Sequence, residues 1–170
     1  QKGADEAMVK DLDAKVMKLD EAIQKNLNLK VADKPGSGAA GAFGAGVVAF
    51  LGGNLESGIE TVLDIVEFDK KVVGADAVFT GEGKIDGQSL RGKVVIGISR
   101  RAMVQNVPVY AVVGDVGDDA TAAYDMGVTA SFSTNRVAVP FSIAKTRSKQ
   151  DFQAAFEDIM RLMKTVEERR

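Results

Sequence analysis

The residues best suited to chemistry lie in one glycine-rich segment, residues 80–93, with the sequence TGEGKIDGQSLRGK. It carries two acids, Glu82 and Asp86, and two lysines, Lys84 and Lys93, among four glycines. Carboxylates hold magnesium or accept a proton, and lysine ammonium groups neutralise phosphate. Glycine also lets backbone N–H groups approach an anion closely. The segment is therefore predicted to be a loop that holds phosphate and a metal ion.

The elements around this loop alternate between strand and helix. Short apolar runs predict three strands, and apolar residues at helical spacing predict three helices. The strands are residues 76–80, 108–113 and 128–132, and the helices are residues 93–105, 118–126 and 148–168. Continuous apolar strands separated by helices predict an α/β fold, with a parallel sheet and flanking helices. Open sheets of this kind bind ligands at the carboxyl ends of their strands, which is where the glycine-rich loop begins.

The first part of the chain differs, because it is mostly helical and rich in glycine. Residues 4–27 predict an amphipathic helix whose apolar stripe is expected to be core. Residues 35–53 predict a helix of glycine and alanine with a bulky end, and residues 57–68 predict a further helix that opens on a capping-box pattern. The change from helices to alternating strands and helices predicts a domain boundary near residues 70–75.

Two glycine patterns are similar to nucleotide-binding motifs. Residues 36–41 spell G-x-G-x-x-G, but the dinucleotide fingerprint needs a strand just before it, and the preceding VADKP is a poor strand. Residues 87–94 match most of a P-loop but end in valine, where magnesium requires a hydroxyl. Two compatible interpretations of the first pattern stay open. Small residues allow close helix packing, and Gly36, Ser37 and Gly38 could form an anion cradle at a helix N-terminus.

The composition excludes several kinds of chemistry. The chain has no cysteine and no histidine, so it has no disulfide, thiolate metal site, Ser-His-Asp triad or histidine-bound zinc. A net charge of −2 gives no electrostatic reason to expect nucleic acid or a membrane surface as partner, and no apolar run is long enough to span a bilayer. The chain begins with Gln1 rather than methionine and its sheet is small, so we expect a piece of a longer protein.

Four motifs resemble the C-terminal part of bacterial glycerate kinases of the type I family. They are QKGA at residues 1–4, the glycine-rich run at 35–46, LESGIETVLD at 55–64 and, most specifically, TGEGKIDGQSLRGK at 80–93. The resemblance covers nearly the whole chain and implies a protein more than twice as long. It implies a flavodoxin-like domain with a second α/β domain inserted into it. Residues 1–73 would be part of the inserted domain, and residues 74–170 would be the C-terminal half of the flavodoxin-like domain.

The resemblance implies an ATP-dependent kinase that phosphorylates a hydroxyl of D-glycerate, with magnesium bridging the phosphates of ATP. Asp86 would act as base or metal-orienting acid, and Glu82 would bind the magnesium or support one of its ligands. The expected contacts with phosphate or substrate are Thr80, Gly81, Gly83 and Lys93, and, from the other domain, Gly36, Ser37 and Gly38. Such chemistry requires mainly positioning and charge neutralisation, which these residue types supply. Whether the 2- or the 3-hydroxyl is phosphorylated stays open.

The resemblance also implies a cytoplasmic bacterial protein that acts with the N-terminal half of the same chain, so residues 1–170 alone are expected to be inactive. A homodimer is left open. Three alternatives remain. Glu82 and Asp86 could be loop acids that cap the following turn. The domain could be a non-catalytic module that binds a nucleotide or organic acid. A dehydrogenase rests only on the weak glycine fingerprint.

Overall fold

A computed structural model of the chain describes residues 3–87 and 89–169. Gln1, Lys2 and Gln88, which belong to two of the motifs named above, lie outside the described residues. Within the described ranges, no helix is both long enough and apolar enough to cross a membrane.

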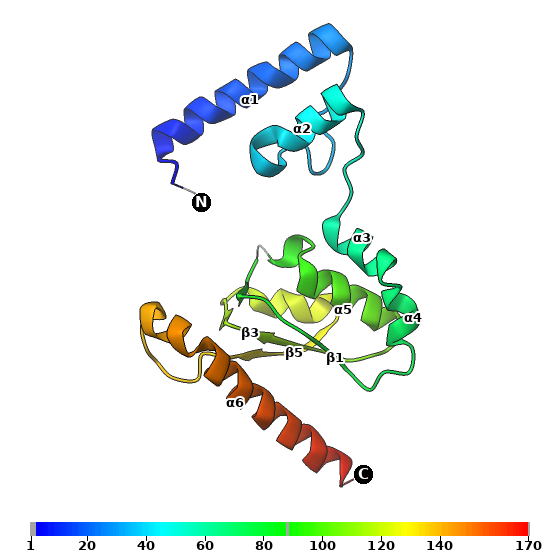
Figure 1. Ribbon diagram of the computed structural model, residues 1–170, viewed down its shortest axis with the longest axis vertical. Helices are drawn as coiled ribbons and strands as arrows, with labels where there is room; N and C mark the ends of the chain where they lie inside the picture. Colours follow the sequence, from blue (N-terminus) through cyan, green and yellow to red (C-terminus); the bar gives the residue numbers. More distant parts are fainter. Residues whose placement is uncertain (1–2, 88, 170) are drawn as a thin grey trace. The chain divides into compact units, whose positions relative to one another are not determined.

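The chain forms two compact units, residues 1–57 and residues 58–170 (Figure 1). Each unit is described by itself. The predicted domain line between residues 73 and 74 refers to the domains of the longer family members and stays a prediction.

The first unit contains two helices, α1 (Glu6–Leu27) and α2 (Ala39–Leu51). The helix α1 begins after Asp5, whose carboxylate accepts a hydrogen bond from the backbone N–H of Met8 at 2.8 Å. An acid at this position stabilises the start of a helix. The helix predicted over residues 4–27 is confirmed.

The apolar stripe of α1 is buried only near its carboxyl end. Ile23 belongs to a small core with Val31, Ala42 and Ala45. The other members of the stripe are exposed: Met8, Leu12, Val16 and Leu19. The prediction that the whole stripe is core is therefore wrong for this unit, because α2 is the one described helix that packs against α1 there.

The second unit is built on a parallel sheet of three strands in the order β1-β3-β5. The strands are β1 (Val78–Thr80), β3 (Val109–Val113) and β5 (Val128–Ser133). They confirm the predicted strands and the α/β fold with a parallel sheet. Two short strands that the sequence did not predict, β2 (Lys84–Ile85) and β4 (Asp115–Val116), form a separate parallel pair.

One face of the sheet is covered by α5 (Val94–Val104), with α3 (Gly58–Ile65) and α4 (Phe68–Val72) packed against it (Figure 1). Between α5 and the sheet lies a core of aliphatic side chains that includes Val95 and Ile96. The helix predicted over residues 93–105 and the helical pattern at 57–68 are confirmed.

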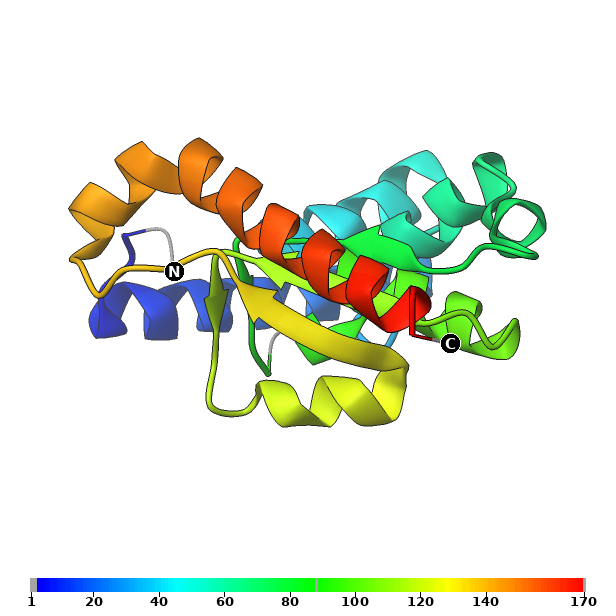
Figure 2. The same ribbon diagram turned by 90° about the horizontal axis from the view of Figure 1, so that it is seen from below.

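The other face is aromatic and is covered by α6 (Phe141–Glu167) (Figures 1 and 2). Phe79, Tyr110 and Phe132 come from three adjacent strands, with ring centroids 5.6 Å apart for the first pair and 6.4 Å apart for the second. Phe156 of α6 packs against Phe79 at 4.9 Å. The sheet is thus flanked by helices on both faces, as predicted.

Three details differ from the sequence predictions. Helix α6 begins at Phe141 rather than at residue 148, because Pro140 occupies the N-cap position, where a proline ring costs no helical hydrogen bond. The segment η2 (Ala120–Met126) is a 3₁₀ helix, although Gly127 ends it in a left-handed conformation as expected. Met103, one of the apolar residues in the helix predicted over residues 93–105, is exposed, since α5 turns Ile96 and its neighbours toward the sheet.

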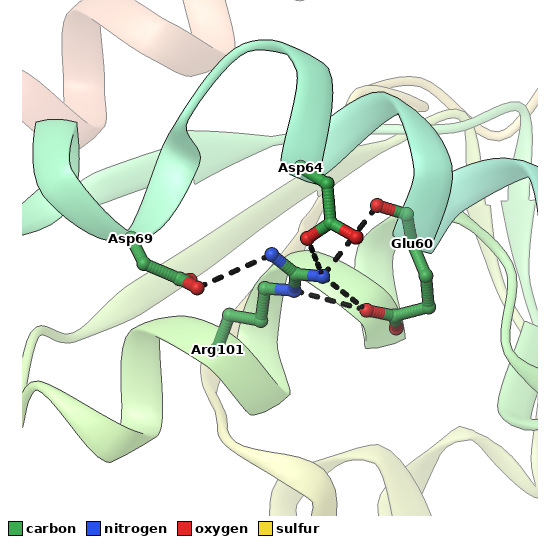
Figure 3. A network of polar contacts seen from close by, with 4 residues as sticks. All are labelled: Glu60, Asp64, Asp69 and Arg101. Carbon is green, nitrogen blue, oxygen red and sulfur yellow. Dashed lines mark hydrogen bonds and ion pairs between the residues drawn. The ribbon is translucent and has the colours of Figure 1, made fainter.

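A network of ion pairs ties α3 and α4 to α5 (Figure 3). The guanidinium of Arg101 on α5 lies 2.8 Å from Glu60 Oε2, 2.5 Å from Asp64 Oδ1 and 3.2 Å from Asp69 Oδ2. Its hydrogen bonds to Asp64 and Glu60 raise the pKa of Arg101 above its usual range, so it stays charged. This arginine thus links both short helices to α5, beside the apolar packing of Val72 against Ala102.

Candidate functional site

The loops that follow β1 and β3 meet at one edge of the sheet. The two strands run parallel, with Thr80 opposite Ala111. The loops that follow their carboxyl ends therefore begin at the same edge of the sheet. The backbone N–H of Gly114 donates to the carbonyl of Glu82 at 3.1 Å, and the N–H of Gly117 donates to the carbonyl of Ile85 at 2.8 Å. The predicted ligand loop is therefore held along its length by the next loop in the sheet.

Two glycines allow this close contact between the loops and strands. A Cβ on Gly81 would lie 2.4 Å from the carbonyl oxygen of Val112, and a Cβ on Gly114 would lie 2.5 Å from the carbonyl oxygen of Gly83. A Cβ on Gly83 would meet open space. Packing against β3 thus explains the glycine at 81, whereas the backbone at Gly83 has room beside it for a ligand.

Asp86 precedes the 3₁₀ turn η1 (Ser89–Arg91) and interacts with its first residue, Ser89. The Asp86 carbonyl and Oδ1 accept from the Ser89 N–H at 2.9 and 3.3 Å, and the buried Ser89 hydroxyl donates to the carbonyl of Lys84 at 3.2 Å. The predicted alternative that Asp86 caps the following turn therefore has a geometric basis. This turn holds Asp86, which is half-buried, in the glycine-rich loop next to η1.

Glu82 points one carboxylate oxygen into the protein. Its Oε1 is shielded from solvent and has no hydrogen-bond partner among the residues that the structure describes. A buried carboxylate oxygen without a donor is costly, and such a group in a native protein calls for an explanation, such as an ion or a water. A bound cation is one such partner, so this oxygen fits the predicted magnesium role of Glu82.

Lys84 lies between several acids of the two loops. Its ammonium group forms an ion pair with Asp115 on β4, with Nζ 3.1 Å from Oδ2. The hydrogen bond and the charge of Asp115 raise the pKa of Lys84 above its ordinary value, and loss of hydration opposes this effect. The charges of Asp86 and Asp119 raise this pKa further. Lys84 therefore keeps a positive charge at the edge of the sheet where phosphate is predicted to bind.

Asp115 and Asp119 were not among the predicted site residues. They belong to the segment GDVGDD, which follows the strand at residues 109–113. The signal was present, because acids after a second parallel strand should meet the loop after the first. Asp119 stands at the N-cap position of the segment at residues 120–126, but its side chain makes no capping hydrogen bond there.

The remaining predicted residues of this unit lie around the same loop. Thr80 is the half-buried last residue of β1. Lys93 is exposed and occupies the N-cap position of α5, directly after Gly92, whose φ is +89°. The structure places Lys93 at a helix N-terminus, as predicted, but no contact that it makes assigns it to phosphate.

Gly36, Ser37 and Gly38 lie in the first unit, before α2. Ser37 is buried, and its hydroxyl donates to the carbonyl of Ala32 at 3.1 Å. A Cβ on Gly44 would lie 2.3 Å from the carbonyl oxygen of Gly36, so small residues do allow close packing there. Residues 3–35 contain no strand before this turn, so the dinucleotide fingerprint lacks its structural context. That these three residues face the cleft of Glu82 and Asp86 stays a prediction.

The described acids of the second unit are too few at any one point to enclose a metal ion by themselves, but they could hold one together with the phosphates of a nucleotide. Within the described residues, no group of three or more acids is arranged to enclose a metal ion. Mg²⁺ in nucleotide sites is commonly held by one or two carboxylates together with phosphate oxygens. Two carboxylates would be enough protein ligands for a magnesium ion that arrives with a nucleotide, and that Glu82 and Asp86 are these ligands stays a prediction.

Comparison with known proteins identifies related chains over almost the full sequence. The model of a family described as the glycerate kinase family matches residues 1–164. A glycerate kinase from Bacillus cereus is 37% identical over 169 residues, which is 99% of this chain and 44% of that protein. A glycerate 2-kinase from Escherichia coli K12 is 39% identical over 166 residues, or 98% of this chain and 42% of that protein.

A solved structure shows the same fold. A crystal structure assigned as glycerate kinase 2 from Salmonella typhimurium LT2 matches 99% of this chain with a TM-score of 0.65 and 32% sequence identity. The match covers 43% of that protein. The chain thus spans less than half the length of the relatives and of the solved structure that it matches.

Proposed function

The chain belongs to the glycerate kinase family, and on this premise we propose that the protein containing it transfers a phosphoryl group from ATP to a hydroxyl of D-glycerate. The product is phosphoglycerate, and the acceptor is an alcohol. The observation that carries this proposal is the meeting of two acidic, glycine-rich loops at the carboxyl edge of the sheet, with the unpaired Oε1 of Glu82 buried beside them.

The residues of this edge match the needs of phosphoryl transfer, which are positioning and neutralisation of negative charge. Glu82 and Asp86 would hold a Mg²⁺ ion that arrives with ATP, and this ion would supply neutralisation of the phosphate charge. Asp86 accepts the proton of the substrate hydroxyl, whose oxygen then bonds to the γ-phosphorus while ADP leaves. Glu82 provides the buried carboxylate oxygen for the metal. Asp86 alternatively orients the metal, with the proton passing to solvent.

The phosphate and substrate contacts are assigned to backbone and lysine. Thr80, Gly81 and Gly83 offer main-chain groups at the end of β1, and Lys93 offers a point charge at the start of α5. We propose that Gly36, Ser37 and Gly38 of the first unit also contact phosphate or substrate. The names of the relatives leave the regiochemistry open, since one is a 2-kinase and others carry no position.

The protein is proposed to need more than residues 1–170 for activity. The relatives are more than twice as long, so an N-terminal half would supply the rest of the sheet and of the substrate site. The named relatives are bacterial, and the substrates are small and polar, which supports a bacterial protein that acts in the cytoplasm.

A coupled ADP-release assay with the complete protein tests this function. ADP release should require both ATP–Mg²⁺ and D-glycerate, and phosphorus NMR of the product should show which hydroxyl carries phosphate. Residues 1–170 alone should give no turnover. Calorimetric binding of ATP–Mg²⁺ and glycerate by the complete protein without ADP release would contradict the kinase and favour a non-catalytic binding module.

A further inference from the structure

A carboxylate that precedes a 3₁₀ helix holds the acidic loop instead of capping that helix. Asp119 stands at the N-cap position of η2 but makes no side-chain hydrogen bond to it. Its Oδ2 accepts a hydrogen bond from the backbone N–H of Gly87 at 2.8 Å. Gly87 directly follows Asp86, so this bond fixes the peptide unit that joins the candidate base to the rest of its loop.

The carboxylate of Asp119 fits between two glycines. A Cβ on Gly87 would lie 2.4 Å from Asp119 Oδ2, and a Cβ on Gly117 would lie 2.9 Å from Asp119 Oδ1. The same Cβ on Gly117 would lie 3.1 Å from the Cβ of Asp86. A side chain at either glycine would push the Asp119 carboxylate out of this position, because the atoms that it would meet first are the Asp119 carboxylate oxygens. The two glycines therefore let Asp119 and Asp86 approach the same turn.

The loop that carries Asp119 is itself fixed to the loop that it supports. The N–H of Gly117 donates to the carbonyl of Ile85 at 2.8 Å, next to the parallel pairing of β2 with β4. The N–H of Ala120 donates to the carbonyl of Gly117 at 3.0 Å. Asp119 thus acts from a backbone that already has a defined register against residues 84–86.

We propose that Asp119 is a positioning residue for phosphoryl transfer, which holds the Gly87 N–H and thereby directs Asp86 toward the substrate hydroxyl. This inference rests on the proposed function. Asp119 touches no substrate in this role and moves no proton. Its effect is geometric, and a displacement of a catalytic group by about 1 Å can lower the rate about 100-fold.

The test compares Asp119→Ala, Asp119→Asn and the matched control Asp118→Ala in the complete protein. Asp119→Ala should lower kcat about 10- to 100-fold, while KM for ATP changes little, because the phosphate contacts remain. Asp119→Asn keeps an oxygen that accepts from Gly87 and should recover most of the loss. Asp118 is exposed and adjacent, so its alanine variant should keep the wild-type kcat.

Hydrogen exchange of the Gly87 amide, followed by NMR in the same proteins, gives a measure that does not depend on turnover. Exchange should be faster in Asp119→Ala and close to wild type in the other two variants. Unchanged Gly87 exchange or an unchanged kcat in Asp119→Ala would overturn the inference, as would an equal loss of kcat in the alanine and asparagine variants. Absence of turnover in the wild-type protein would instead remove the proposed function, and the catalytic role of Asp119 with it.

Discussion

Lys84 and Asp115 form an ion pair that joins the two short strands at the candidate site, with Nζ 3.1 Å from Oδ2. The lysine comes from the loop after β1, and the acid comes from the loop after β3. Both side chains are more than half exposed, so the pair is expected to add little to global stability. Its main consequence is electrostatic, because it fixes one positive charge among the acids of both loops.

We predict that Asp115→Asn lowers the pKa of Lys84. Asp115 is the largest cause of the raised pKa, so the folded protein binds this proton more tightly than the unfolded chain does. This tighter proton binding stabilises the folded protein. The stabilisation is complete below the ordinary lysine pKa of 10.5 and is lost as the pH rises through the raised Lys84 pKa of the folded state. NMR titration of the Lys84 side chain measures the change. Asp118→Asn is the control, and equal Lys84 titrations in both variants would refute the assignment.

We predict that Gly81→Ala destabilises the protein by roughly 1–3 kcal/mol, since the new methyl would press on the carbonyl of Val112. Gly83→Ala places its methyl in open space and is expected to change stability by less than about 1 kcal/mol. Urea unfolding of both variants measures the free energy of unfolding. Equal stability of the two variants would show that Gly81 is not required for the approach of the loop to β3.

We predict that Arg101→Met loosens α3 and α4 before the rest of the second unit. The substitution removes the group that pairs with Glu60, Asp64 and Asp69, and it leaves these three acids to repel one another. Arg101→Lys should loosen these helices less than Arg101→Met does. A lysine keeps the positive charge but lacks the planar fork of arginine, so it replaces only part of the ion-pair network.

Amide exchange over residues 58–72 measures this loosening, and Arg100→Met is the control on the next, exposed position. Exchange should be fastest in Arg101→Met and near wild type in the control. Identical exchange in Arg101→Met and wild type would show that apolar packing alone holds these helices.

A second ion pair predicts a pH effect at low pH. On α6, Arg147 Nε and Nη2 donate to the buried carboxylate of Asp151 at 3.1 and 3.0 Å. The hydrogen bond from Arg147 lowers the pKa of Asp151, burial opposes it, and the charges of Arg147 and Arg136 assist. The stabilisation is present above the ordinary aspartate pKa of 3.8 and is lost as the pH falls through the lowered folded value.

Arg147→Met should therefore raise the pKa of Asp151. Burial raises this pKa, and the variant removes the hydrogen bond from Arg147 that opposes it. Carbon-detected NMR of the Asp151 carboxyl group follows the titration. The control is Lys149→Met on the same helix, which should leave the titration as in wild type. An Asp151 pKa that stays low in Arg147→Met would show that another group sets it.

Much of the fold follows from local patterns. The apolar runs at 108–113 and 128–132 predicted the strands found at 109–113 and 128–133, and helical spacing identified α1 and α5. Local patterns failed where the decisive interaction is distant in sequence. The pairing of β2 with β4 joins segments of two residues each, which are too short to show any periodicity.

The sequence predicted the acids of the first loop of the candidate site but not those of the second. Glu82 and Asp86 stand in a dense glycine motif, so residue type and spacing indicated them. Asp119 was missed because its partner, the N–H of Gly87, is 32 residues away, so only its place after the second parallel strand indicated it. The glycines of this loop were expected to let backbone N–H groups approach a bound anion, and in the structure the anion at the Gly87 N–H is the carboxylate of Asp119.

The turnover of Asp86→Asn in the complete protein tests the central claim most directly. Asparagine keeps the size of the side chain and an oxygen that accepts from Ser89, so the turn should remain folded, as circular dichroism can verify. A base or metal-orienting acid contributes about 100- to 10,000-fold to the rate, and kcat for ATP-dependent phosphorylation of D-glycerate should fall by that factor. A folded Asp86→Asn protein with nearly wild-type kcat would contradict the claim that this loop is the seat of phosphoryl transfer.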